Sequence, residues 1–287
     1  NPAAENLFEL AKKHLVGHRP EQIFGDAQGL CAAIDKAELG GATYTEQELE
    51  LAVAGKAKLH LTCTVSPVDT RAAALLLEFR HIDQQLKIAR ERAEAAGVSD
   101  RVKFELIDYR DLARTAHGQF DRIVSVGMFE HVGVPQFETF FRSAANMLTD
   151  DGVMLLHTIG RLGKPGSTDA FTRKYIFPGG YIPALSETLS ASEKSKLIAT
   201  DIENLRLHYA LTLRAWYARV CEQREAIITM MDARFYRMWT FYLAGATAAF
   251  EWGGMCNYQI QFARNRRSLP ITRDYMAISE ADIRSRH

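Results

Sequence analysis

The alternation of apolar and polar residues is clearest over residues 120–160. An apolar, β-branched run at 123–128 is typical of a strand buried on both faces. Apolar residues at helical spacing then predict a helix over 135–148. A turn is predicted at 150–152, and a second apolar run at 153–156 predicts another strand. This order of strand, helix and strand predicts an α/β fold with two parallel strands.

Each of these two strands is followed by an ionisable residue. Glu130 comes soon after the first strand, and His157 closes the second. The carboxyl ends of parallel strands lie at one edge of a sheet, which is where open α/β sheets bind ligands. A single histidine at a strand end is more often an ordinary polar residue, so this pattern alone leaves both interpretations open.

The chain before this region is harder to interpret. Residues 1–17 have the spacing of an amphipathic helix, and a capping box from Thr45 to Glu48 predicts a helix that runs to Lys58. Residues 59–65 suit a strand and residues 71–79 a helix. The five residues between them, SPVDT, contain no glycine.

A regular pattern returns at residue 85. Residues 86–96 predict a helix that Gly97 ends, because glycine tolerates the left-handed conformation that follows many helices. Residues 101–107 alternate polar and apolar, as a strand does, and lead to Asp108 and Tyr109.

The second half of the chain is strongly apolar. A turn-rich segment, YIFPGGYIPAL, covers 175–185, and helices are predicted over 201–220 and 226–251. The latter carries a stripe of methionine and aromatic side chains, which more often belongs to a core but also suits a flexible lipid tail. A final strand is predicted at 257–263.

Composition narrows the function classes. The chain has 287 residues, of which 47% are hydrophobic and 24% charged, and its formal net charge is zero. A neutral chain has no global field that would favour nucleic acid. The four cysteines are scattered, which argues against a metal site or a disulfide framework and for a reducing compartment. We expect no membrane-spanning stretch and no signal-peptide core.

Three short motifs give a more specific indication. SVGMFEHVG, LLHTIG and YIFPGG, which lie between residues 125 and 180, resemble the cyclopropane-fatty-acid-phospholipid synthase and mycolic acid cyclopropane synthase family. The resemblance runs from about residue 85 to 264. It implies a Rossmann-like class I methyltransferase sheet with a helical lipid-binding insertion or extension. It also implies S-adenosylmethionine as the methyl donor. Family members carry a glycine-rich turn where this chain has SPVDT.

The resemblance suggests a division of the chain into four parts. These are an N-terminal helical segment at 1–58, the methyltransferase core at 59–160, an acyl-chain-binding region at 161–250, and a final strand and tail at 251–287.

The resemblance also implies site residues. In the family, a bound bicarbonate ion is thought to act as the base. The residues of this chain that match its ligands are Cys31, Glu130, His157, Tyr209 and the backbone amide of Ile159. The four side chains among them are also the expected catalytic residues. Contacts to S-adenosylmethionine fall on Asp108, Tyr109 and Gly127. No metal is implied.

The expected reaction is transfer of a methyl or methylene group to the cis double bond of an unsaturated phospholipid acyl chain, which gives a cyclopropane or a methyl branch. We expect a cytoplasmic enzyme that meets its lipid at a membrane surface. Whether it binds the inner membrane face, and whether it forms a homodimer, is left open. Two rivals are a catalytically impaired member that binds lipid or regulates a partner, and a methyltransferase for small molecules.

Overall fold

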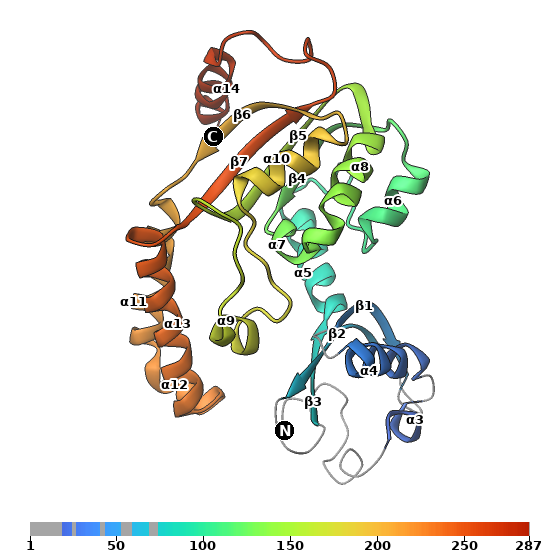
Figure 1. Cartoon of the computed structure of the whole chain (residues 1–287), viewed down its shortest axis with the longest axis vertical. Helices are drawn as coiled ribbons and strands as arrows, with labels where there is room; N and C mark the ends of the chain where they lie inside the picture. The colour runs from blue at the N-terminus through green and yellow to red at the C-terminus, as the bar shows by residue number, and fades with distance from the viewer. Residues whose placement is uncertain (1–18, 25–26, 41–43, 53–58, 69–73, 287) are drawn as a thin grey trace. The chain divides into compact units, whose positions relative to one another are not determined.

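The computed structural model describes residues 19–24, 27–40, 44–52, 59–68 and 74–286 (Figure 1). Two compact units are present, one formed by residues 1–106 with 174–179 and the other by residues 107–173 with 180–287. The boundary after residue 106 falls inside the segment that the sequence predicts as the core.

The first unit contains a small antiparallel sheet. Its strands, in spatial order, are β1 (Tyr44–Leu51), β2 (Leu59–Val68) and β3 (Ala74–His81). Its helices are α3 (Pro20–Ile23), α4 (Gln28–Gly40) and α5 (Ile82–Ala95). Apolar residues alternate along β2 at Leu61, Cys63 and Val65, so that all three side chains lie on one buried face. Helix α4 packs against β1 and β2 to close this core.

Two helices predicted for this region are wrong. The capping-box segment at 45–58 contains β1, because Leu49 and Leu51 alternate and both enter the core. The segment at 71–79 overlaps β3, whose backbone pairs with β2 along its whole length. In both places hydrogen bonds to a neighbouring strand override the local helical pattern. The helix predicted at 1–17 lies outside the described residues.

The second unit is built on a mixed sheet. Its strands, in spatial order, are β4 (Phe120–Val126), β5 (Leu148–Arg161), β7 (Met255–Ala263) and β6 (Ile198–Asn204). Strands β4 and β5 are parallel, as the sequence predicts, and β7 is antiparallel to both of its neighbours. The α/β class is therefore confirmed.

Helices cover one face of this sheet (Figure 1). They are α6 (Tyr109–Thr115), α7 (Phe129–Val132), α8 (Phe137–Met147) and α10 (Leu185–Glu193). Their core includes Phe129, Phe141, Leu156, Ile260 and Phe262. The predicted helix at 135–148 is confirmed as α8, which follows a short 3-10 turn, η1 (Val134–Gln136).

The remaining helices are α9 (Ala170–Tyr175), α11 (His208–Glu222), α12 (Arg224–Met230), α13 (Ala233–Glu251) and α14 (Asp274–Ser285). Helices α11 and α13 pack along each other at the start of β7, around Ala210, Leu213 and Leu243 (Figure 1). The helix predicted at 226–251 is in fact two helices, α12 and α13, and the start of the helix predicted at 201–220 lies in β6.

Two strand predictions also need correction. Residues 101–107, all of which the structure describes, belong to no strand. The predicted turn at 150–152 lies inside β5, where the register shifts between the pairs Phe120–Leu148 and Arg122–Val153. An irregularity of this kind absorbs extra residues without ending the strand. Because β5 continues to Arg161, His157 lies within the strand and not at its end.

Candidate functional site

Glu130 is held at the carboxyl end of β4 by backbone contacts. Gly127 adopts a left-handed conformation with φ 64°, which turns the chain from β4 towards α7. Its N–H donates to the carbonyl oxygen of His157 at 3.1 Å. The Oε1 atom of Glu130 accepts a hydrogen bond from the N–H of Ile159 at 2.7 Å. The carboxylate is therefore bound to β5. This strand lies between its parallel neighbour β4 and its antiparallel neighbour β7.

The second oxygen of this carboxylate, Glu130 Oε2, is buried and has no hydrogen-bond partner among the residues that the structure describes. Tyr209, at the start of α11, lies close enough to be affected by its charge. Burial raises the pKa of Tyr209, and the charge of Glu130 raises it further. The hydroxyl of Tyr209 therefore stays protonated and can donate a hydrogen bond. Its ring packs against Phe250 and Trp216, at centroid distances of 5.0 and 6.1 Å.

His157 lies between two amide side chains of β7. Its Nδ1 atom is 3.3 Å from Gln259 Nε2, and its Nε2 atom is 3.3 Å from Asn257 Nδ2. Gln259 is the cross-strand partner of His157, and Asn257 is the partner of Ile159. Side chains alternate along strands, so these four residues share one face of the sheet. Asn257 is only 4% exposed, and its Oδ1 atom has no partner.

Cys31 belongs to the first unit, on α4. Its Sγ atom donates to Glu21 Oε1 at 3.0 Å. Burial, followed by this hydrogen bond, raises the pKa of Cys31 to about 11. The thiol is therefore a hydrogen-bond donor at neutral pH. Its role in the site that contains Glu130 stays a prediction.

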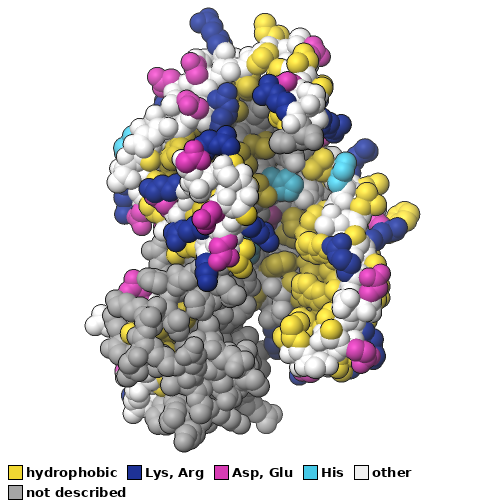
Figure 2. Space-filling model, turned by 180° about the vertical axis from the view of Figure 1, so that it is seen from behind, with side chains coloured by type: hydrophobic (Ala, Val, Ile, Leu, Met, Phe, Trp, Pro, Cys, Tyr) yellow, Lys and Arg dark blue, Asp and Glu magenta, His cyan; other side chains and the backbone are white. Residues whose placement is uncertain are grey.

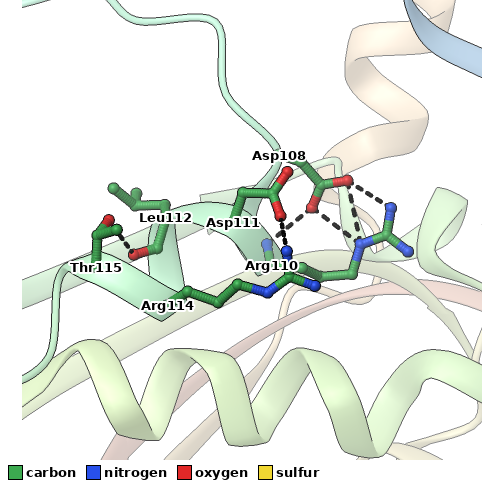
Figure 3. A network of polar contacts seen from close by, with 6 residues as sticks. All are labelled: Asp108, Arg110, Asp111, Leu112, Arg114 and Thr115. Carbon is green, nitrogen blue, oxygen red and sulfur yellow. Dashed lines mark hydrogen bonds and ion pairs between the residues drawn. The ribbon is translucent and has the colours of Figure 1, made fainter.

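Asp108 and Tyr109 are both expected to contact the cofactor. Asp108 caps the start of helix α6 (Figure 3), and Tyr109 is the first residue of that helix. Asp108 accepts from the backbone N–H of Arg110 at 2.8 Å, and its carboxylate also binds the Arg110 guanidinium. The hydrogen bond from Arg110 is the main reason that the pKa of Asp108 is lowered. Tyr109 packs edge-on against Phe140. Both residues thus have structural contacts, and their cofactor contacts stay a prediction.

The described residues between 59 and 81 form the strands β2 and β3. A strand followed by a helix, with free backbone N–H groups at the turn, is the arrangement that binds nucleotide cofactors. The described part of this segment therefore lacks that arrangement, in agreement with the missing glycines.

Apolar side chains gather on the helices α11–α13 (Figure 2). The exposed ones include Leu211, Trp216, Tyr217, Met230 and Phe241, and the exposed Met231 follows directly after α12. Within the described part of the chain, no helix is both long and apolar enough to cross a bilayer. The same residues hold no group of three or more histidine, cysteine or acidic side chains that could bind a metal.

The structure thus brings together four of the predicted residues in the second unit: Gly127, Glu130, His157 and Ile159, with Tyr209 close to Glu130. It adds Asn257 and Gln259, which the sequence analysis missed. A signal for them was present, because polar residues occupy every second position of the predicted strand at 257–263. Which strand faces them is not a local property of the sequence.

Comparison with known proteins gives matches to one family. The sequence model for mycolic acid cyclopropane synthetase matches residues 81–260. A probable fatty acid methyltransferase from Pseudomonas putida is 36% identical over 202 residues, which cover 67% of this chain and 51% of the relative. The cyclopropane-fatty-acyl-phospholipid synthase of Escherichia coli K12 is 39% identical over 181 residues, or 63% of this chain and 45% of the relative. The chain spans about half the length of these curated relatives.

Solved structures show the same fold. The structure of a cyclopropane synthase from Mycobacterium tuberculosis superposes with a TM-score of 0.54 at 27% identity, and covers 64% of this chain and 67% of that one. A putative sarcosine dimethylglycine methyltransferase from Galdieria sulphuraria gives 0.56 at 15% identity over 64% of this chain and 67% of that one, which supports the fold alone. The predicted methyltransferase fold is therefore confirmed.

Proposed function

The chain belongs to the mycolic acid cyclopropane synthetase family, and from this premise we propose that it methylates the double bond of an unsaturated fatty acyl chain, with S-adenosylmethionine as donor. The observation that carries the proposal is the Glu130 carboxylate. One of its oxygens is fixed by Ile159 and the other is buried without a partner beside Tyr209. A buried acceptor without a donor calls for an explanation, and the one that we propose is a bound ligand that donates to it.

Bicarbonate fits this set of residues. Its hydroxyl can donate to Glu130 Oε2, and its charged oxygens can accept from the protonated hydroxyl of Tyr209. Bound there, bicarbonate would supply the base that removes a proton from the methylated intermediate. In the structure the Ile159 amide donates to Glu130, so we assign this amide to holding the carboxylate.

The residues of the chain have three tasks in this reaction. Glu130 orients the hydroxyl of the anion and places negative charge near a cationic intermediate. Tyr209 donates to the anion, and its ring packs against the buried Phe250. Cys31 stays a predicted ligand only, because its one S–H is donated to Glu21 within the first unit.

The fit to S-adenosylmethionine is partial. At Gly127 an added Cβ would meet no atom within 4 Å, so the backbone at the end of β4 is open to a ligand. By contrast, the Asp108 carboxylate binds Arg110, and residues 59–81 offer no strand–turn–helix where they are described. When bound, S-adenosylmethionine would supply the methyl group, and Gly127 would lie against it.

We propose that the lipid comes from a membrane surface. Exposed Met230 on α12, Met231 directly after it and Phe241 on α13 would present apolar side chains to an acyl tail. Dimer formation stays a prediction that light scattering would check.

The test uses the purified chain with S-adenosylmethionine and vesicles of a monounsaturated phospholipid. We expect mass spectrometry to detect acyl chains that have gained one CH2 group. Glu130→Gln and Tyr209→Phe should each lower turnover on the order of 100-fold, because each removes a group that contacts the base. Tyr217→Phe, which changes another tyrosine of α11, is the matched control and should stay active. An unchanged product yield in Glu130→Gln would contradict the proposal.

A further inference from the structure

Arg161, the last residue of strand β5, carries a positive charge that no described carboxylate neutralises. Its Nε–H donates to the carbonyl oxygen of Ile182 at 3.0 Å, and its Nη2 donates to the carbonyl oxygen of Ser167 at 3.5 Å. Both acceptors are neutral, and Arg161 forms no ion pair with any residue that the structure describes. Two of the five N–H donors of a guanidinium are thus in use, and the others are left for a ligand.

The carboxylates of the neighbouring segments are bound elsewhere. Asp169 Oδ1 accepts from the N–H of Thr172 at 2.9 Å, at the start of α9. Glu187 accepts from the hydroxyl of Tyr181 and from the N–H of Ala184. The side chain of Arg161 is half-buried, and charges that are partly removed from water are usually paired. Its environment therefore favours an anion that the chain itself does not supply.

A glycine-rich loop, residues 162–168, lies against this guanidinium. Both ends of the loop are fixed by hydrogen bonds of 2.7 Å, one from the N–H of Leu162 and one from the hydroxyl of Thr168. A Cβ added at Gly166 would come within 2.2 Å of Arg161 Nη1. The absence of a side chain at Gly166 is therefore what lets the loop and the guanidinium approach each other.

The loop also contributes donors of its own. The backbone N–H groups of Gly163, Lys164 and Ser167 donate to no atom of the residues that the structure describes. Gly163 has a φ of 88°, in the left-handed region that glycine enters without strain. Lys164 is exposed and adds a second positive charge. Backbone N–H groups in turns of this kind are a recurrent way of binding phosphate.

This group of donors is connected to the Glu130 site through strand β5. Ile159, whose N–H binds Glu130, precedes Arg161 by two residues, so their side chains lie on one face of the strand with Cα atoms about 7 Å apart. The segment that begins at Tyr181 contacts both positions. The N–H of Tyr181 donates to the carbonyl oxygen of Glu130 at 2.8 Å, and the carbonyl oxygen of Ile182 accepts from Arg161. The guanidinium ends a long side chain, so the two sites are neighbours but separate.

We propose that Arg161 and residues 163–168 form a second anion site, which binds the phosphate of a phospholipid head group. This inference rests on the proposed function, because it takes a phospholipid as the substrate. The planar guanidinium matches two phosphate oxygens at once, and the loop N–H groups donate to the remaining oxygens. A phosphodiester carries one negative charge, which Arg161 neutralises.

The consequence is selection of a lipid class. A phospholipid is held at two points, by its acyl chain beside Glu130 and by its phosphate at Arg161. A neutral acylglycerol has no group for Arg161 and is held by its chain alone. A free phosphate ion offers the same oxygens as a head group, so the tests separate these two sources.

The first test uses the full chain labelled with 15N and no methyl donor. The probes are glycerophosphoglycerol, which is a head-group diester without acyl chains, and monomeric dihexanoyl phosphatidylglycerol, whose chains have no double bond. Each should shift the Nε–H signal of Arg161, and the lipid should bind more tightly because its chains add apolar contact. No shift with either probe, or a shift with inorganic phosphate alone, would overturn the assignment to a lipid head group.

The second test measures the affinity of the same two probes for variants. Arg161→Gln removes the charge and the paired donors, and we expect binding to weaken about tenfold or more. Arg161→Lys keeps the charge without the planar fork and should recover only part of the affinity. Gly166→Ala retains Arg161 but fills the space of its Nη1 atom, so it should also weaken binding. Arg142→Gln, at an exposed arginine of helix α8, is the matched control and should bind as the unmodified chain does.

The outcomes separate this inference from the proposed function. Unchanged affinity in Arg161→Gln would overturn the inference, whatever the activity of the chain. If a variant fails to fold, the Arg161 signal of the unmodified chain still decides. If the probes bind through Arg161 and no lipid is methylated, the proposed function fails while the inference stands.

Discussion

At the scale of single residues, the environment of a side chain determines its chemistry. Tyr209 and Cys31 both have raised pKa values because burial disfavours their charged forms. Both side chains therefore keep their protons at neutral pH, and Cys31 donates its proton to Glu21. Glu130 offers the complementary acceptor. A backbone N–H fixes one of its oxygens, and the other oxygen is left to accept a hydrogen bond from a ligand.

The raised pKa of Cys31 predicts slow alkylation at neutral pH, since the thiolate is the reactive form. Its rate should rise steeply only as the pH approaches 11. A pKa that is higher in the folded chain than in the unfolded chain also stabilises the folded chain. This contribution of Cys31 is fully present below its ordinary pKa of 9.0 and is lost as the pH rises through about 11. Peptide mapping after iodoacetamide treatment would measure the rate at Cys31. Glu21→Gln removes the charged acceptor and should lower the pH at which Cys31 reacts; an identical pH profile would contradict this cause.

Gly127 allows a prediction about backbone strain at the end of β4. Gly127→Ala should destabilise the chain by about 1 kcal/mol, because its φ is positive while the added Cβ has free space. Gly245→Ala, in helix α13 with equal space around it, should stabilise by roughly 0.5–1 kcal/mol. Urea denaturation measures both. Effects of the same sign would show that space, and not φ, controls these sites.

At the scale of elements, helix α10 depends on one carboxylate. Glu187 accepts from the N–H of Ala184 at 2.9 Å, and the hydroxyl of Tyr181 donates to both of its oxygens. This contact joins the apolar segment 175–185 to the start of the helix. The segment was predicted to line an acyl pocket or to pack in a core satellite; Tyr181 packs against the main core of the second unit.

Glu187→Ala should therefore cost about 1–2 kcal/mol of unfolding free energy, by loss of a helix N-terminal hydrogen bond and of the Tyr181 contact. Glu193→Ala, an exposed carboxylate in the same helix, is the control and should change stability by less than about 0.5 kcal/mol. Thermal unfolding of both variants gives the comparison. Equal losses would refute a specific role for Glu187.

At the scale of the whole molecule, binding of the methyl donor is the decisive property. The family to which the chain belongs favours binding, while the β2–β3 pair occupies the place of the expected glycine turn. We expect calorimetric titration of the intact chain to detect S-adenosylmethionine and S-adenosylhomocysteine. Asp108→Asn should weaken both if Asp108 leaves Arg110 to contact the cofactor. No heat from either compound would favour a lipid-binding role instead.

Local patterns in the sequence were sufficient to predict several helices and strands of the second unit. The strand β4, the helix α8 and the strand β7 follow from runs of apolar residues at the right period, and Gly97 ends α5 with φ 64° as predicted. Short motifs also singled out Glu130, because its position soon after β4 is encoded within a few residues. The expected burial of this strand on both faces is wrong, because Val124 and Val126 are exposed.

Only the tertiary structure decided which strands are neighbours. Cross-strand hydrogen bonds turned two predicted helices into β1 and β3, and pairing with β7 continues β5 past His157 to Arg161. The pairing of β5 with β7 placed Asn257 and Gln259 against His157, a hundred positions earlier in the chain. The sequence by itself determined the period of each segment and the residues that carry charge. Register and pairing depend on distant parts of the chain, so the partners of His157 appear only in the folded sheet.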